Sequence, residues 1–299
     1  MLGRLSRSIH FRLSYAYRSR MLARYRRRVL EQQHLSAPDK PAADFTLLSI
    51  IGQKQLELLQ ISLWSIGQAW TKLPPLRVVS DGSLEPDQIT AALKWWPQPV
   101  EALRWEPIAQ AQADRGRPAL LKLATGNVLA RKLCAILHSA ELGPTLFCDS
   151  DVLWFRGPPP LPQDSVALKL AEDFMPSFDA ELFNAAGAGE FRHKPYLNTG
   201  VVFARGDLHA AAGLWSILPW AAEHPQYFTE QTLLAYACKR LDGDHWTRQQ
   251  IFLSIEDAVH PWADRSYFRT ALARHYVGDV RHWFWRDALQ LIHSHPVQS

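Results

Sequence analysis

Residues 145–154 read Thr-Leu-Phe-Cys-Asp-Ser-Asp-Val-Leu-Trp, and this stretch decides the fold. It places two carboxylates, Asp149 and Asp151, one residue apart between apolar segments with strand character. Burial of two carboxylate anions is costly unless a cation compensates them. Carboxylate oxygens are hard ligands that suit Mn²⁺ or Mg²⁺. The pair therefore predicts a divalent metal site; the alternative is a surface turn whose acids cap a helix.

On both sides of this stretch, short apolar runs alternate with segments of helical periodicity. The expected strands are 45–51, 76–80, 145–148 and 165–170, and the expected helices are 53–70, 86–96 and 120–142, the last with a break near Gly126. This alternation is typical of βαβ units, so we expect an α/β fold with a mostly parallel, Rossmann-like central sheet flanked by helices. Ligands bind such sheets beyond the carboxyl ends of the strands, where the two acids lie.

Composition and cysteine usage indicate a globular, intracellular protein. The chain has 299 residues, of which 47% are hydrophobic and 21% charged, enough for a sizeable core in one α/β unit. No apolar run reaches the roughly 18 residues of a membrane span, and there is no glycine-rich phosphate loop. The three cysteines have no metal or redox spacing, which favours a reducing compartment. We expect a cytoplasmic protein.

The basic character of the chain is concentrated at its start. Residues 1–30 hold nine arginines and no acid, whereas the rest holds 24 basic against 29 acidic residues. Apolar residues recur there at helical spacing: Leu2, Leu5, Ile9, Leu13, Tyr17, Met21 and Tyr25. We expect a basic amphipathic helix over 1–30 and a linker over 31–43. The pattern favours binding of this helix to an anionic surface at the inner face of a membrane. The main alternative is a helix that packs on its own domain. Nucleic acid is not an expected partner.

Several short blocks give the chain a family resemblance. Residues 145–155 resemble the Asp-x-Asp strand of the GT-A-fold glycosyltransferases, most closely the retaining group that includes glycogenin and bacterial lipopolysaccharide glucosyl- and galactosyltransferases. Four further blocks match the family in the same order: 131–133, 196–202, 229–234 and 275–283. The chain departs from the family at Thr232, where the family has an acid, and at Arg281-His282, where it has Lys-Pro. The resemblance covers about residues 45–285 in layout.

This resemblance implies a GT-A domain over 44–299 that transfers a sugar from a nucleoside-diphosphate sugar, with UDP as the implied nucleotide and retention favoured over inversion. It implies a Mn²⁺ or Mg²⁺ ion on Asp149, Asp151 and His275. The implied donor contacts are Ser49, Lys132, Asp149, Asp151, Gly200, Gly278 and Arg281. The implied catalytic residues are Asn198, Glu230 and Gln231. An inverting enzyme would need a carboxylate base, for which Glu172 and Asp173 are available, and Trp283 and Trp285 are acceptor candidates.

The sequence leaves the donor sugar and the acceptor open. The acceptor could be a lipid-linked glycan, a polysaccharide, a protein or a small metabolite. Two other functions compete with sugar transfer. One is a different metal-dependent nucleotidyl or phosphoryl enzyme that uses Asp149 and Asp151, and the other is an inactive membrane-surface scaffold of the same fold. The intact set of Asp149, Asp151 and His275 argues against the scaffold.

Overall fold

The computed structural model of the protein describes residues 2–32, 35–258 and 265–294. Its centre is a seven-stranded sheet with strand order β3-β2-β1-β4-β7-β6-β8. The strands are β1 (Thr46–Ile51), β2 (Leu76–Ser80), β3 (Val100–Arg104), β4 (Thr145–Cys148), β6 (Ala167–Glu172), β7 (Leu197–Arg205) and β8 (His245–Trp246). The pairs β3–β2, β2–β1, β1–β4 and β6–β8 are parallel, and β7 runs antiparallel to both β4 and β6. The expected α/β fold with a mostly parallel sheet is confirmed.

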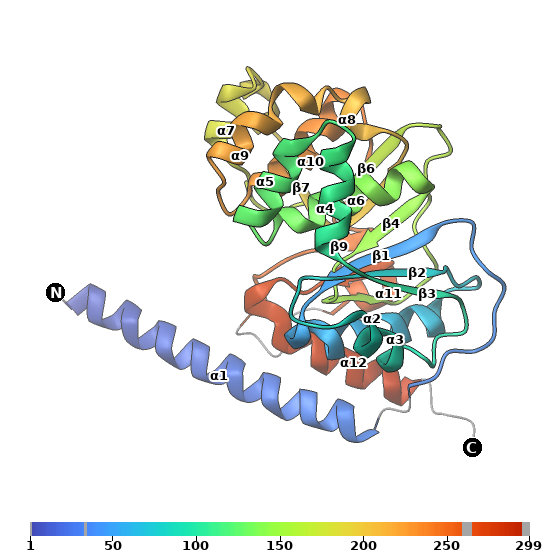
Figure 1. The fold of residues 1–299 in the computed structure, drawn as a ribbon. Helices are drawn as coiled ribbons and strands as arrows, with labels where there is room; N and C mark the ends of the chain where they lie inside the picture. Colours follow the sequence, from blue (N-terminus) through green and yellow to red (C-terminus); the bar gives the residue numbers. More distant parts are fainter. Residues whose placement is uncertain (1, 33–34, 259–264, 295–299) are drawn as a thin grey trace.

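Helices cover both faces of this sheet (Figure 1). They are α2 (Leu56–Ala69), α3 (Pro86–Ala92), α4 (Trp105–Asp114), α5 (Pro118–Gly126), α6 (Ala130–Leu142), α7 (Ala180–Ala185), α8 (Leu208–Ala211), α9 (Leu218–Glu223) and α10 (Thr229–Arg240). A further short helix, α11 (Tyr267–Thr270), follows later in the chain. Successive strand residues point to opposite faces: Leu47 packs into the α2–α3 side of the core and Leu48 into the α6–α10 side. Burial on both faces explains why the strands read as continuous apolar runs.

Most predicted elements appear with small shifts at their ends. The break expected near Gly126 separates α5 from α6. The helix expected over 86–96 ends at Ala92, and Pro97 disfavours helical backbone at the residue before it. The segment expected as a helix from residue 53 begins with a 3₁₀ turn, Gln53–Gln55, and the strand expected from 165 begins at Ala167.

A second, three-stranded sheet extends the molecule beyond β4. It contains β5 (Val152–Trp154), β10 (Ala273–His275) and β9 (Ile251–Phe252), with β10 in the middle and antiparallel to β5. Because β5 begins directly after Asp151, this pairing brings the C-terminal segment against the acidic end of β4.

The N-terminal segment forms one long helix, α1 (Leu2–Gln32), whose second half packs on α12 (Arg281–Ser294). Val29 is fully buried, and Tyr17 and Tyr25 pack against the buried cluster that contains Trp283 and Phe284 of α12. From Tyr17 onward the apolar stripe therefore faces the protein itself, and the expectation that the whole stripe faces a membrane is wrong for this half. The first half projects beyond the body of the molecule (Figure 1).

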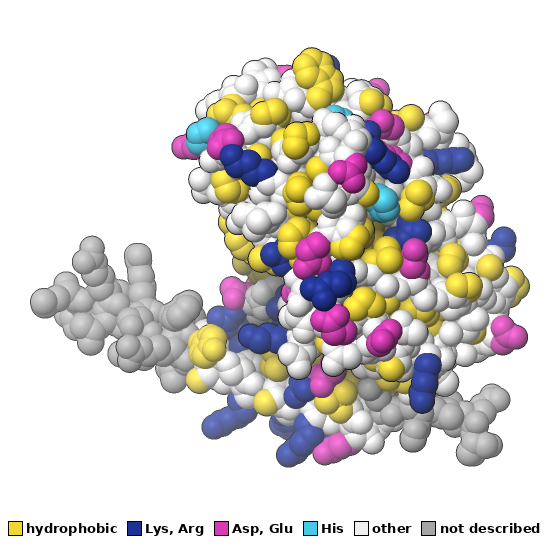
Figure 2. Space-filling model, viewed as in Figure 1, with side chains coloured by type: hydrophobic (Ala, Val, Ile, Leu, Met, Phe, Trp, Pro, Cys, Tyr) yellow, Lys and Arg dark blue, Asp and Glu magenta, His cyan; other side chains and the backbone are white. Residues whose placement is uncertain are grey.

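The linker expected over 31–43 begins as part of helix α1, and Lys40 ties its later part to the body of the molecule by hydrogen bonds. The helix continues to Gln32, and Lys40 Nζ donates hydrogen bonds to the carbonyls of Gly67 and Trp70 at 2.7 and 2.6 Å. Arginine side chains stand exposed along the described part of α1 (Figure 2), including Arg20 and Arg24. Within the described ranges, no helix is long and apolar enough to cross a membrane.

Candidate functional site

The carboxyl ends of the parallel strands open onto a cavity of about 560 Å³. Its wall is built from residues that follow neighbouring strands: Asp81 after β2, Gly52 after β1, Asp149 after β4 and Asp173 after β6. Since strands in α/β sheets end at one common edge, residues distant in sequence meet there. This is the place where the sequence predicted the chemistry.

Asp149, Asp151 and His275 converge in this cavity. One ligand atom from each lies within 4.8 Å of the others. His275 Nε2 is 3.2 Å from Asp151 Oδ1 and 3.6 Å from Asp149 Oδ2. The β5–β10 pairing causes this proximity, because it sets His275 opposite Val152 and joins the N–H of Tyr276 to the carbonyl of Asp151 at 2.9 Å.

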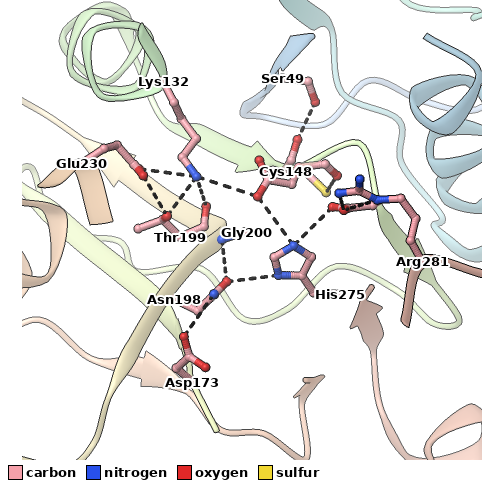
Figure 3. A network of polar contacts seen from close by, with 12 residues as sticks. Ser49, Lys132, Cys148, Asp173, Asn198, Thr199, Gly200, Glu230, His275 and Arg281 are labelled. Carbon is pink, nitrogen blue, oxygen red and sulfur yellow. Dashed lines mark hydrogen bonds and ion pairs between the residues drawn. The ribbon is translucent and has the colours of Figure 1, made fainter. Parts of the chain in front are cut away.

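The orientation of the His275 ring is set by Asn198 (Figure 3). An amide oxygen only accepts, so Nδ1–H of His275 donates to Asn198 Oδ1 at 3.1 Å and Nε2 faces the two acids. The same oxygen accepts from the N–H of Gly200 at 2.8 Å, and Asn198 Nδ2 donates to Asp173 Oδ2 at 3.3 Å. A Cβ on Gly200 would lie 2.2 Å from the imidazole ring, so only glycine leaves room for the ring here.

Positive groups surround the two acids. Arg281 donates to Asp151 Oδ2 through Nη2 at 2.5 Å and Nε at 3.1 Å. Burial alone would raise the pKa of Asp151, but the hydrogen bond from His275 and the charges of His275 and Arg281 hold it well below its usual range. Burial raises the pKa of Asp149. Burial opposes charge on His275, yet the hydrogen bond to Asp151 and the charges of both acids raise its pKa. The acids thus occupy a setting that demands compensating cations.

A second set of buried polar side chains extends from the two acids toward α10. The Nζ of Lys132 is 3.8 Å from Asp149 Oδ2, 3.4 Å from Glu230 Oε1, and donates to Thr199 Oγ1 at 2.9 Å. Burial raises the pKa of Glu230 to about 7. Its Oε1 is buried and accepts no hydrogen bond from the part of the chain that the structure describes. Lys132 and Glu230 therefore form a buried ion pair beside the two acids.

The structure brings together ten of the eleven residues that the resemblance assigned. All of the following line the cavity: Lys132, Asp149, Asp151, Asn198, Gly200, Glu230, Gln231, His275, Gly278 and Arg281. Ser49 is the exception, because its Oγ is buried and donates to the carbonyl of Cys148 at 2.6 Å, which ties β1 to the end of β4. Gln231 Nε2 donates to the carbonyl of Ser177 at 2.6 Å, which leaves the amide oxygen of Gln231 for other partners.

The two tryptophans suggested as acceptor contacts, Trp283 and Trp285, do not lie at the cavity. Trp283 is 1% exposed and Trp285 3% exposed, and both lie in the core between α12 and α1. Sequence reasoning missed Asp81, which was interpreted only as part of a turn although it follows a strand. It also missed four exposed apolar side chains at the cavity, for which the sequence carries no periodic signal: Val128, Leu129, Met175 and Tyr227.

The architecture is that of the GT-A glycosyltransferases. Mouse xyloside xylosyltransferase 1, in its apo form, matches 80% of this chain and 99% of its own with a TM-score of 0.53 and 12% identity. The galactosyltransferase LgtC, solved with donor and acceptor sugar analogs, matches 85% of this chain and 98% of its own with a TM-score of 0.51 and 16% identity. No protein-family model and no curated protein sequence matches the chain. At these identities the likeness concerns the fold.

Proposed function

We propose that this chain is a metal-dependent glycosyltransferase that moves a sugar from a nucleoside-diphosphate sugar to an acceptor hydroxyl. The observation that carries the proposal is the convergence of Asp149, Asp151 and His275 at the carboxyl edge of a GT-A sheet. Lys132 and Arg281 add positive charge to the same cavity. Both solved structures of this fold described above are glycosyltransferases by name.

The donor set fits a divalent cation. Two carboxylates and one imidazole nitrogen, with Nδ1 of His275 already bound to Asn198, form the usual arrangement of a metal-binding histidine and its supporting partner. We expect Mn²⁺ ahead of Mg²⁺, because Mg²⁺ strongly prefers oxygen ligands. When bound, such an ion stabilises the negative charge that develops on a departing diphosphate.

The other residues bind and orient the donor. Arg281 pairs with Asp151 and is 41% exposed at its side chain, so it can turn to phosphate oxygens when a cation takes over Asp151. Lys132 supplies a second, buried positive charge. Asn198, Glu230 and Gln231 face the region beside the metal ligands, where the transferred sugar would lie, and Gly278 borders the diphosphate.

We propose that the sugar is transferred with retention. Inversion needs a free carboxylate base near the acceptor. Asp173 already accepts hydrogen bonds at both oxygens, from the N–H of Phe174 at 2.7 Å and from Asn198 at 3.3 Å. Glu172 Oε2 accepts from the N–H of Arg248 at 3.2 Å, and Glu172 does not line the cavity. Neither of the two carboxylates considered for this role is free.

The exposed apolar part of the cavity lining favours an amphiphilic acceptor, such as a lipid-linked glycan. Eight large apolar side chains stand exposed within the described residues, and half of them line this one cavity: Val128, Leu129, Met175 and Tyr227. Clustered exposed apolar side chains mark binding surfaces. Tyr227 is 72% exposed, which offers an aromatic face to a sugar or an apolar carrier.

Helix α1 would hold the enzyme at an anionic membrane surface, peripheral to the inner face of the membrane. Arg18 of α1 forms an ion pair with Asp279, which lines the cavity, so this helix passes beside the cavity wall. A lipid-linked acceptor would then reach the apolar part of the cavity lining from the same surface.

The test is to incubate the protein with UDP-sugars and Mn²⁺ and to identify the products by mass spectrometry. A glycosyltransferase yields UDP together with free or transferred sugar. A phosphohydrolase or nucleotidyl enzyme yields UMP and sugar phosphate, and that product pair would contradict the proposal. Asp151→Asn is expected to abolish product formation, while Asp87→Asn, an exposed acid outside the cavity, leaves it unchanged.

A further inference from the structure

One part of the cavity wall is a short segment, residues 277–281, between β10 and α12. Its middle is a 3₁₀ turn, Gly278–Val280. All of its residues except Val280 line the cavity. Val280 is fully buried and belongs to the apolar cluster to which α1, α2 and α12 all contribute. The same five residues therefore form the cavity wall and contact the core beneath α1.

Two ion pairs connect the side chains of this segment to other parts of the described chain. Arg281 donates to Asp151 beside the predicted metal ligands (Figure 3). Asp279 accepts a hydrogen bond at Oδ1 from Nη1 of Arg18, and the same nitrogen donates to the main-chain oxygen of Asp279 at 3.5 Å. When a divalent cation takes over Asp151, the pair between Asp279 and α1 is the one that remains.

Arg18 is turned toward the protein, unlike its neighbour Arg20 on the same helix. The side chain of Arg18 is 15% exposed, whereas Arg20 is exposed. A guanidinium with so little access to water requires a compensating charge, and Asp279 is the acid that pairs with it in the described part of the chain. The adjacent Tyr17 ring meets the buried His282 ring edge-on, with centroids 6.3 Å apart. This turn of α1 therefore covers the segment and the start of α12.

The segment is anchored at both ends but open in its middle. The N–H of Tyr276 is bonded to the carbonyl of Asp151 at 2.9 Å before the segment, and Val280 is buried near its end. Between them, a Cβ on Gly278 would meet no heavy atom within 4 Å, and the side chain of Asp279 is 61% exposed. Because packing does not fix this turn from the cavity side, its position depends on the contact with Arg18.

We infer that Arg18 is a positioning residue for donor binding. Through Asp279 it holds the turn in the place where Gly278 and Arg281 meet the diphosphate, so that binding does not have to order this segment. This inference rests on the proposed function, since it gives helix α1 a part in the same donor site. The helix is then more than a membrane attachment, because one of its arginines acts on the cavity wall.

Calorimetric titration of UDP in the presence of saturating Mn²⁺ tests the assignment. Arg18→Gln is expected to weaken UDP about fivefold, the effect of losing one partly exposed ion pair. Arg18→Lys keeps the charge and is expected to retain most of the affinity. Arg26→Gln is the matched control: it removes another ion pair of α1, made with Glu57 of α2 through two contacts of 2.6 Å, and neither partner lines the cavity.

A double-mutant cycle shows whether Arg18 acts through Asp279. Asp279→Asn removes the same contact and is expected to weaken UDP by a similar factor. In the Asp279→Asn background, Arg18→Gln is expected to cause no further loss, because the interaction that it removes is already absent. Losses that multiply in the double variant would contradict the assignment.

Melting temperatures separate this role from a general loosening of α1. A merely structural role would make Arg18→Gln and Arg26→Gln alike in UDP affinity as well as in stability. Unchanged UDP affinity in Arg18→Gln, or an equal loss in Arg26→Gln, would overturn the inference while the proposed function stands. Failure of the wild-type protein to bind any nucleoside diphosphate would overturn both.

Discussion

At the scale of single residues, metal binding by His275 is expected to depend on the side chain that orients its ring as well as on the ring itself. Asn198 accepts from Nδ1 and thereby turns Nε2 toward the acids. Loss of such a supporting partner commonly costs 10–100-fold in metal affinity. Asn198→Ala is therefore expected to weaken Mn²⁺ binding by roughly 10–100-fold. Water-proton relaxation with Mn²⁺ measures this; affinity equal to wild type would remove Asn198 from the site.

The pH dependence of stability reports on Glu230. Its pKa rises from 4.5 to about 7 because burial disfavours the anion. The folded chain then keeps a proton that the unfolded chain releases between these values, so the free energy of unfolding falls as pH rises through this window. The loss is on the order of 3 kcal/mol. Glu230→Gln is expected to abolish this fall.

Urea unfolding of the metal-free protein at about pH 5 and about pH 8 makes the comparison. Glu223→Gln is the control, because this exposed glutamate pairs with Lys122 and its pKa is lowered rather than raised. Equal pH dependence in wild type and Glu230→Gln would show that Glu230 titrates normally.

Single residues also show which parts of the cavity could be predicted from the sequence and which could not. Asp149 and Asp151 were identifiable because they interrupt an apolar strand. Asp81 was not, since an Asp-Gly pair after a strand is usually an ordinary turn. Its place in the cavity wall depends on Gly52 and Ser83, whose positions around it follow only from the packing of β1 against β2.

At the scale of elements, α1 divides into two halves with different tasks. Its second half buries Val29 and covers the aromatic face of α12, whereas the backbone of the first half projects away from the body. Periodicity predicted the helix but could not assign its partner, because an apolar stripe fits a lipid surface and a neighbouring helix equally well.

Two deletions separate these tasks. Removal of residues 1–13, which hold three of the nine arginines, is expected to weaken binding to anionic vesicles, since each arginine near such a surface contributes on the order of 1 kcal/mol, and to leave the melting temperature unchanged. Removal of residues 1–32 uncovers Trp283 and Phe284 and is expected to lower the melting temperature by roughly 5–10 °C. Sedimentation with anionic and neutral vesicles gives the first result and calorimetry the second. Equal sedimentation of full-length and shortened chains would exclude the membrane role.

At the scale of the whole molecule, the site exists because two sheets meet. The large sheet supplies Asp149 and Asp151, and the three-stranded sheet delivers His275 through the β5–β10 pairing. The βαβ pattern predicted the first sheet, since parallel strands separated by helices leave a clear period in sequence. Two- and three-residue strands leave no such signal, so the second sheet could not be derived from periodicity, and the position of His275 was suggested by family resemblance.

The central claim is that these two sheets together form one metal site. Electron paramagnetic resonance of Mn²⁺, titrated into the protein with UDP present, tests it most directly. We expect a bound Mn²⁺ signal in the wild-type protein, no bound signal in Asp151→Asn, and binding weakened roughly tenfold or more in His275→Ala, with all three proteins folded. Bound Mn²⁺ at equal affinity in folded wild type, Asp151→Asn and His275→Ala would contradict it.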